Sequence, residues 1–98
     1  MSELTLLVTY TAKPGMRETF LRALAARGIP DMIRAEAGCL QYEYFISVME
    51  PDEILLVERW TGPEAQAAHL RQPHMARLRE IKEQYVEATV LRKLGEVE

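Results

Sequence analysis

The chain has 98 residues, a length typical of one domain, with a net charge of −3 and a pI near 5.4. This acidic balance argues against nucleic-acid binding, because proteins that follow the phosphate backbone usually carry a basic face. The single cysteine excludes an intrachain disulfide, and no apolar run approaches the length needed to cross a membrane. We therefore expect one cytoplasmic domain over residues 1–98, with neither a nucleic-acid nor a membrane partner.

The first half of the chain predicts a strand followed by an interrupted helix. Residues 4–11 are rich in β-branched and aliphatic side chains and stop at a turn signal over residues 13–15. An apolar stripe with helical spacing follows, made by Met16, Phe20, Leu21 and Leu24. Gly28 and Pro30 predict a break in this helix, because proline lacks an amide hydrogen and collides with the preceding turn. Helical structure is expected to resume and to end at Gly38.

Two strands are predicted next. Residues 40–48 alternate between apolar and polar side chains, and the alternation places Leu40, Tyr42, Tyr44, Ile46 and Val48 on one face. A turn at residues 50–52 leads into a third strand over residues 53–61. The two strands are expected to form a hairpin.

The last part of the chain predicts two helices and a final strand. Thr61 is expected to cap the first helix, with Glu64 completing a capping box. Pro73 is expected to open the second helix, in which an apolar stripe is made by Met75, Leu78, Ile81 and Tyr85. Residues 86–91 alternate again and predict a strand that ends near Leu94.

The order βαββαβ is the split-βαβ, ferredoxin-like pattern of an α+β fold, in which helices cover one face of a four-stranded antiparallel sheet. The uncovered face of such a sheet should be polar, yet residues 6–8 and 54–57 are apolar on both faces. A second copy packing sheet to sheet would cover this surface. The sequence therefore predicts a homodimer.

Few residues suit nucleophilic, nucleotide or metal chemistry. Cys39 follows Gly38 at the start of a strand, and packing is the better interpretation of such a cysteine than a reactive thiol. The five glycines form no phosphate loop. His69 and His74 are five residues apart, which on one helix would separate them by about 140°, so we expect no metal site. His74, near a helix start, is expected to cap the helix or to face solvent.

A small apolar pocket with a few polar groups is the remaining possibility for a site. Trp60 shares a strand face with Glu58 and Leu56, and this face meets the helix bearing His69 if it is turned toward the helices. Trp60 is either a core residue or the wall of a site for a planar aromatic ligand. His69 is either a proton acceptor or a satisfied core residue. The hydroxyls of Tyr10, Tyr42 and Tyr44 serve the pocket or the dimer interface.

Three segments carry a resemblance to a known family. They are Glu36-Ala37-Gly38-Cys39-Leu40-Gln41-Tyr42, Val57-Glu58-Arg59-Trp60 and His69-Leu70-Arg71-Gln72-Pro73-His74-Met75. In this order and spacing the chain resembles the antibiotic biosynthesis monooxygenase family of small dimeric α/β-barrel proteins. The resemblance implies the same ferredoxin-like fold and the same homodimer.

The third segment is particularly similar to the bacterial quinol monooxygenases of that family. The resemblance implies oxidation of a quinol or polycyclic phenol by O₂ without a cofactor, because the deprotonated substrate is itself the reductant. Trp60 would then pack against the substrate ring and His69 would accept its proton. The other expected substrate contacts are Tyr42, Tyr44, Leu56, Met75 and Arg79.

Other branches of the family imply other activities. Haem-degrading relatives carry a histidine nineteen positions after the tryptophan, where this chain has Arg79, and an asparagine in the first strand, whereas this chain has no Asn. Haem degradation is therefore disfavoured. An isomerase of small ketones or phosphorylated sugars would need an anion contact, which Arg71 or Arg79 can supply. The alternative to an enzyme is a non-catalytic dimeric module that binds a small aromatic molecule.

Overall fold

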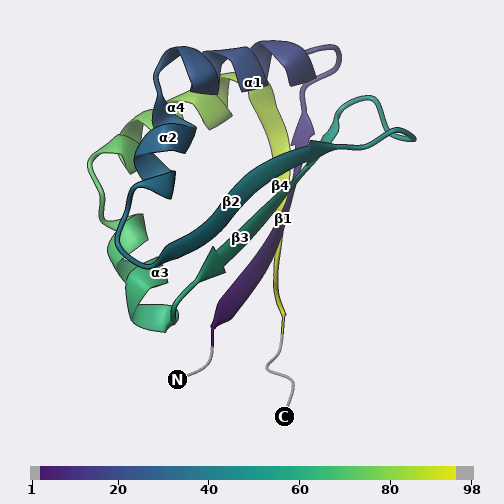
Figure 1. Ribbon diagram of the computed structural model, residues 1–98. Helices are drawn as coiled ribbons and strands as arrows, with labels where there is room; N and C mark the ends of the chain where they lie inside the picture. Colours follow the sequence, from purple (N-terminus) through teal and green to yellow (C-terminus); the bar gives the residue numbers. More distant parts are fainter. Residues whose placement is uncertain (1–2, 95–98) are drawn as a thin grey trace.

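The computed structural model describes residues 3–94 and has an antiparallel sheet with four helices on one face (Figure 1). Its elements are β1 (Leu4–Ala12), α1 (Arg17–Ala26), α2 (Ile29–Arg34), β2 (Cys39–Ile46), β3 (Glu53–Trp60), α3 (Pro63–Leu70), α4 (His74–Tyr85) and β4 (Val86–Leu94). The sheet order is β2-β3-β1-β4, so β2 and β4 are the edge strands. This is the α+β, ferredoxin-like fold with a four-stranded antiparallel sheet, and the prediction of the fold class is confirmed.

The core lies between the sheet and the helices. Alternate residues of β1 and β3 are buried against the helices, because successive side chains of a strand point to opposite faces. The largest fully buried side chains are Trp60, Phe20, Leu24, Ile29, Ile33, Ile54 and Leu56. Burial of each such side chain contributes roughly 1.5–3 kcal/mol relative to an exposed one. The face of β3 that carries Leu56, Glu58 and Trp60 is therefore the helix-facing one.

The opposite face of the sheet carries apolar side chains that the described residues leave partly open. Leu7, Leu55 and Val57 are partly exposed, and Val90 on the edge strand β4 is 59% exposed. Leu7 and Val57 are directly paired across β1 and β3, so they form one continuous apolar surface. The homodimer expected from this pattern stays a prediction.

The predicted break in the first helix is confirmed. Helix α1 ends at Ala26 and α2 begins at Ile29. Gly28 between them has φ +65°, a left-handed conformation that side chains rarely adopt. Arg34, at the end of α2, donates from Nε to the carbonyl oxygen of Tyr42 at 2.9 Å. This contact satisfies a backbone acceptor on the outer edge of β2.

Two predicted details are wrong. The N-cap of α3 is Gly62 and no side chain caps this helix, because the Thr61 amide is tied to the Gly38 carbonyl oxygen at 2.9 Å and Thr61 stays with the strand end. The alternation predicted for residues 40–48 also fails at both ends. A register shift between Cys39 and Gln41 displaces Leu40 from the face of Tyr42, and Val48 lies beyond the strand, 95% exposed.

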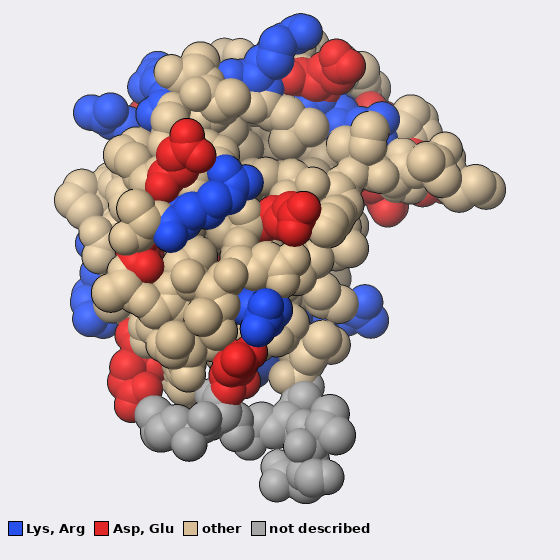
Figure 2. Space-filling model, in the orientation of Figure 1, with Lys and Arg blue, Asp and Glu red and all other residues tan. Residues whose placement is uncertain are grey.

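The surface carries mixed charge. Figure 2 shows Lys and Arg side chains interspersed with Asp and Glu on the face drawn there. Among the described residues, none of the helices is both long and apolar enough to cross a membrane.

Candidate functional site

A cavity of about 220 Å³ lies between the sheet and the two helices α3 and α4. Leu6 and Val8 of β1 and Leu78 of α4 form much of its apolar lining, while β4 contributes Thr89 and Leu91 at the sheet edge. Its carboxylate, imidazole and cationic groups come from three elements: Glu58 of β3, His69 of α3, and Arg79 and Lys82 of α4. Uncharged polar groups are added by Tyr10, Tyr42, Gln66 and Thr89. It is a small apolar space with polar groups directed into it, the usual composition of a small-molecule site.

His69 is the best-positioned proton acceptor of this cavity. Helix α3 buries its side chain to 2% exposure, and Nδ1 lies 3.1 Å from each carboxylate oxygen of Glu36. An ionised carboxylate only accepts hydrogen bonds, so Nδ1 of His69 carries the hydrogen. The lone pair of the neutral ring is then on Nε2, the nitrogen that a base needs to take a proton from a ligand.

Glu36 holds both histidines. It lies in the connection between α2 and β2, its side chain is 7% exposed, and Oε2 accepts a hydrogen bond from Nε2 of His74 at 2.6 Å. The expectation that His74 caps its helix or faces solvent is wrong, because its side chain is only 13% exposed and is paired with Glu36. The turn at Pro73 puts the two histidines on different helices, and these converge on one carboxylate.

Nδ1 of His69 and Nε2 of His74 each lie within hydrogen-bond distance of a carboxylate oxygen of Glu36. Within residues 3–94, no group of three or more His, Cys, Asp or Glu side chains is arranged to hold a metal ion.

Glu58 is a second buried polar group that the sequence interpretation did not assign to the site. It is 6% exposed and accepts a hydrogen bond at 3.0 Å from Nε1 of Trp60. Burial raises the pKa of this carboxyl, while the Trp60 hydrogen bond and the nearby His69 and Lys82 oppose the rise. One feature of the sequence could have identified Glu58 as a site residue: it is an acidic side chain between Leu56 and Trp60 on a strand face that is otherwise apolar.

Trp60 lies behind His69 and outside the cavity wall. Its ring centroid is 4.6 Å from that of His69, with a 34° angle between the planes, and the residue is fully buried. The indole therefore supports two groups of the site: its face packs on His69 and its N–H binds Glu58.

The tyrosines are neutral donors in this environment. Burial raises the pKa of Tyr42 well above its ordinary value, and burial raises the pKa of Tyr44 to about 12. Their hydroxyls lie 3.5 Å apart. Tyr42 and Tyr10 line the cavity, whereas Tyr44 borders a separate hollow beside Leu24 and Arg34.

The structure brings four of the seven expected site residues to the cavity: His69, Tyr42, Met75 and Arg79. Trp60, Leu56 and Tyr44 do not line it. Leu56 is fully buried in the core, between Ile54 and Glu58 on the same strand face. The roles proposed for these residues in ligand binding stay predictions. Glu36 and Glu58, which the interpretation of the sequence missed as site residues, both stand inside segments that carry the family resemblance.

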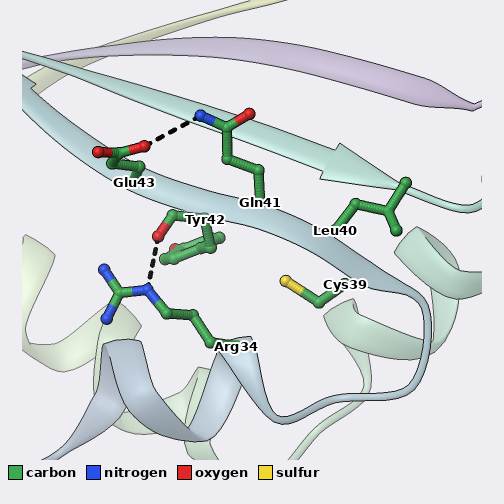
Figure 3. A pocket seen from close by; sticks show the side chains of 6 residues that line it. All are labelled: Arg34, Cys39, Leu40, Gln41, Tyr42 and Glu43. Atoms are coloured by element: carbon green, nitrogen blue, oxygen red, sulfur yellow. Dashed lines mark hydrogen bonds between the residues drawn. The ribbon is translucent and has the colours of Figure 1, made fainter.

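A shallower hollow lies at the outer edge of β2, bounded by Arg34 and residues 39–43 (Figure 3). The Arg34 guanidinium turns toward the backbone of Tyr42, and Gln41 binds Glu43. Cys39 is partly buried, and burial raises the pKa of its thiol, which disfavours the reactive thiolate. The polar groups here bind one another, so the inner cavity is the better candidate site.

Residues 4–81 of the chain match the family model described as antibiotic biosynthesis monooxygenase. The chain belongs to the antibiotic biosynthesis monooxygenase family. The match covers β1 through most of α4 and so includes Glu36, Glu58, His69 and His74. No curated protein matches the chain.

Solved structures of similar proteins share the fold of this family member. PA3566 from Pseudomonas aeruginosa is 31% identical, with 100% of this chain and 97% of that chain covered and a TM-score of 0.85. A Bacteroides thetaiotaomicron protein described as of unknown function and a possible oxidoreductase is 28% identical, with 95% and 96% covered and a TM-score of 0.82. A Nitrosomonas europaea protein, provisionally described as an antibiotic biosynthesis monooxygenase, is 20% identical, with 97% and 90% covered and a TM-score of 0.85; at that identity it shows the fold alone.

Proposed function

We propose that this protein is a cofactor-independent monooxygenase that oxidises a quinol or polycyclic phenol with O₂. One observation carries the proposal: His69 lines an apolar cavity and its Nδ1 is held by Glu36, which leaves Nε2 as the proton acceptor toward the ligand. The monooxygenase description of the family agrees with this chemistry.

The reaction asks little of the protein beyond a base and a dry cavity. Nε2 of His69 takes the proton of the substrate hydroxyl, and the resulting phenolate transfers an electron to O₂. The phenoxyl radical and superoxide combine with formation of a C–O bond, and the peroxide takes back the proton from the His69 imidazolium. The hydroperoxide then loses water as its O–O bond and the C–H bond at the same carbon break, leaving a quinone carbonyl. Glu36 stabilises the imidazolium that forms, and the apolar lining from Leu6, Val8 and Leu78 excludes water from the reactive intermediate.

Oxygen consumption tests the proposal. A naphthohydroquinone added to the protein should produce O₂ uptake above the rate of autoxidation measured without protein. His69→Ala should return the rate to that background. Saturable binding without protein-dependent uptake would instead identify a non-catalytic module that binds small aromatic molecules.

We further propose that the active assembly is a homodimer formed by the apolar sheet face. Leu7, Leu55 and Val57 share this face, and burying them against a second copy removes apolar area from water. A charge at Val57 would then be buried without a partner, which costs several kcal/mol. Val57→Asp should convert the protein to a monomer in light scattering, whereas Ala76→Asp on the exposed surface of α4 should not. A wild-type monomer at micromolar concentration would contradict the dimer.

A further inference from the structure

The cavity has opposite electrostatic character at its two ends. At one end, which we name the acceptor end, are the Glu58 carboxylate and the His69 ring. At the other, the cation end, are the Arg79 guanidinium and the Lys82 ammonium of α4. The first pair accepts hydrogen bonds and the second pair donates them.

The strand register places the two ends beside different positions of β1. Glu58 pairs with Leu6 of β1, whereas the Lys82 ammonium lies 5.0 Å from the centroid of the Tyr10 ring, farther along the same strand. Tyr10 is four positions after Leu6, which is roughly 13 Å along the backbone of an extended strand. Val8 lies between them and lines the cavity with an apolar side chain. Glu58 and Lys82 each shift the pKa of the other although they form no ion pair, so the two groups act on the same cavity space.

Lys82 lacks a neutralising partner. Within residues 3–94 it forms no ion pair, although it is partly buried. Burial lowers the pKa of this ammonium, and Glu58 opposes the change from a distance. Contact with the Tyr10 ring is a weak substitute for an anion. A ligand anion at this position would restore the electrostatic stabilisation that burial removes.

The acceptor end is also incomplete. The Glu58 carboxylate accepts one hydrogen bond, from Trp60, and His69 forms a hydrogen bond to Glu36 through Nδ1. Both therefore keep an acceptor for a hydroxyl group. A carboxylate at this end would face Glu58 and be repelled.

We propose that the cavity binds an arene with a hydroxyl group at the acceptor end and an anionic group at the cation end. This inference shares only the cavity with the proposed function. If the proposed function holds, it restricts the substrates to hydroxyarenes that carry a carboxylate or another anion. The volume of about 220 Å³ lies below the range of drug-sized sites and limits the ligand to about two rings.

Titration calorimetry with four stable probes tests the proposal on the full chain. The probes are 6-hydroxy-2-naphthoate, with both groups at opposite ends, 2-naphthol without the anion, 2-naphthoate without the hydroxyl, and 6-hydroxynaphthalene-2-sulfonate with a different anion. We expect 6-hydroxy-2-naphthoate to bind about tenfold more tightly than either probe that lacks one group, and added salt to weaken that preference over 2-naphthol. Tighter binding of the sulfonate than of the carboxylate would support the proposal and identify the anion as the larger, tetrahedral kind.

Variants of α4 assign the preference to residues. Lys82→Gln should remove the preference of 6-hydroxy-2-naphthoate over 2-naphthol, and Arg79→Gln should weaken it by less, because Arg79 is exposed. Arg77→Gln is the matched control, an exposed arginine on the same helix that does not line the cavity. Equal affinity for 2-naphthol and 6-hydroxy-2-naphthoate, an unchanged preference in Lys82→Gln, or failure of all four probes to bind would each overturn the proposal.

Oxygen uptake separates this proposal from the enzymatic one. Selective binding of the hydroxynaphthoate without uptake from any hydroquinone would support the ligand class and contradict the monooxygenase. Uptake with no advantage for substrates bearing an anion would overturn the ligand class alone.

Discussion

The acceptor end and the cation end of the cavity are held in place by different means. His69 is 2% exposed and is bound on one side by Glu36 and on the other by the Trp60 ring. Arg79 is exposed, and Lys82 is partly buried with its ammonium 5.0 Å from the centroid of the Tyr10 ring. A base must lie within hydrogen-bond reach of the proton it takes, whereas a long flexible cation can follow an anion. Under the proposed function, this difference fits an acceptor end that performs the proton transfer and a cation end that recognises the ligand.

Removal of the imidazole should have the largest effect. His69→Ala should lower the turnover of a hydroquinone by roughly 10²–10⁴-fold, because general base catalysis contributes a factor of that size. Stopped-flow measurement of O₂ uptake checks this, with Arg77→Gln, at an exposed position of α4 outside the cavity lining, as the control. Ionisation of the phenol also makes the uncatalysed rate of O₂ uptake rise with pH. If His69 is the base, His69→Ala should therefore lose the protein-dependent part of the pH–rate profile and keep the uncatalysed part. More than about a third of wild-type kcat in His69→Ala would contradict its role as the base.

Loss of the group that orients His69 should have the second largest effect. Glu36→Gln can no longer accept hydrogen bonds from both histidines at once, so the His69 ring should populate the wrong tautomer or rotate. We expect kcat to fall by roughly 10–100-fold with little change in KM. His74→Gln keeps a donor toward Glu36 and should retain most of the activity. A larger loss in His74→Gln than in Glu36→Gln would show that His74 does more than position Glu36.

Trp60→Phe should affect stability and binding together. The substitution leaves the buried Glu58 carboxylate without its donor, which costs roughly 1–3 kcal/mol in the free energy of unfolding. It also loosens the support of His69, and we expect the affinity for a planar quinone analogue to fall by roughly 0.5–1.5 kcal/mol. Urea unfolding and calorimetry measure the two effects, with Tyr85→Phe on α4 as the control. In the wild type, the emission of Trp60 should be quenched saturably by the analogue, and quenching linear in concentration would contradict a site.

Glu58 should produce the smallest effect, visible as a dependence of stability on pH. Burial raises its pKa above the ordinary 4.5, so the folded protein binds this proton more tightly than the unfolded chain does. The stability that Glu58 contributes is fully present below pH 4.5 and is lost as the pH rises through the raised pKa. Glu58→Gln keeps an acceptor for Trp60 and should remove this loss.

The expected result is a Tm that exceeds that of the wild type by several degrees at high pH and converges with it in acid. Thermal unfolding followed by circular dichroism between about pH 4 and pH 8 measures this difference. Glu80→Gln, at an exposed position of α4, should leave the pH profile of the wild type unchanged. Parallel profiles for Glu58→Gln and the wild type would contradict a raised pKa.

The local pattern of the sequence was sufficient for the fold. The β-branched and aliphatic run over residues 4–11 predicted β1, and the hairpin signal over residues 40–61 predicted β2 and β3. The apolar stripe of Met75, Leu78, Ile81 and Tyr85 predicted α4. Gly28 and Pro30 predicted the break between α1 and α2. These predictions succeed because periodicity and turn chemistry act over a few residues. The N-cap at Thr61 failed because a contact with Gly38, 23 positions earlier in the chain, decided it.

The site depended on tertiary structure to a greater degree. The sequence determined that Trp60 and Glu58 share a strand face and that His69 lies on the following helix, so the contact of Trp60 with His69 could be expected. Only the tertiary structure decided that Glu36 joins His69 and His74. It also decided that Trp60 stands behind His69, and that Lys82 lies in the same cavity as Glu58 without forming an ion pair. Spacing along the chain reports which residues share one element, whereas the meeting of a loop carboxylate with two helices depends on how those elements pack on the sheet.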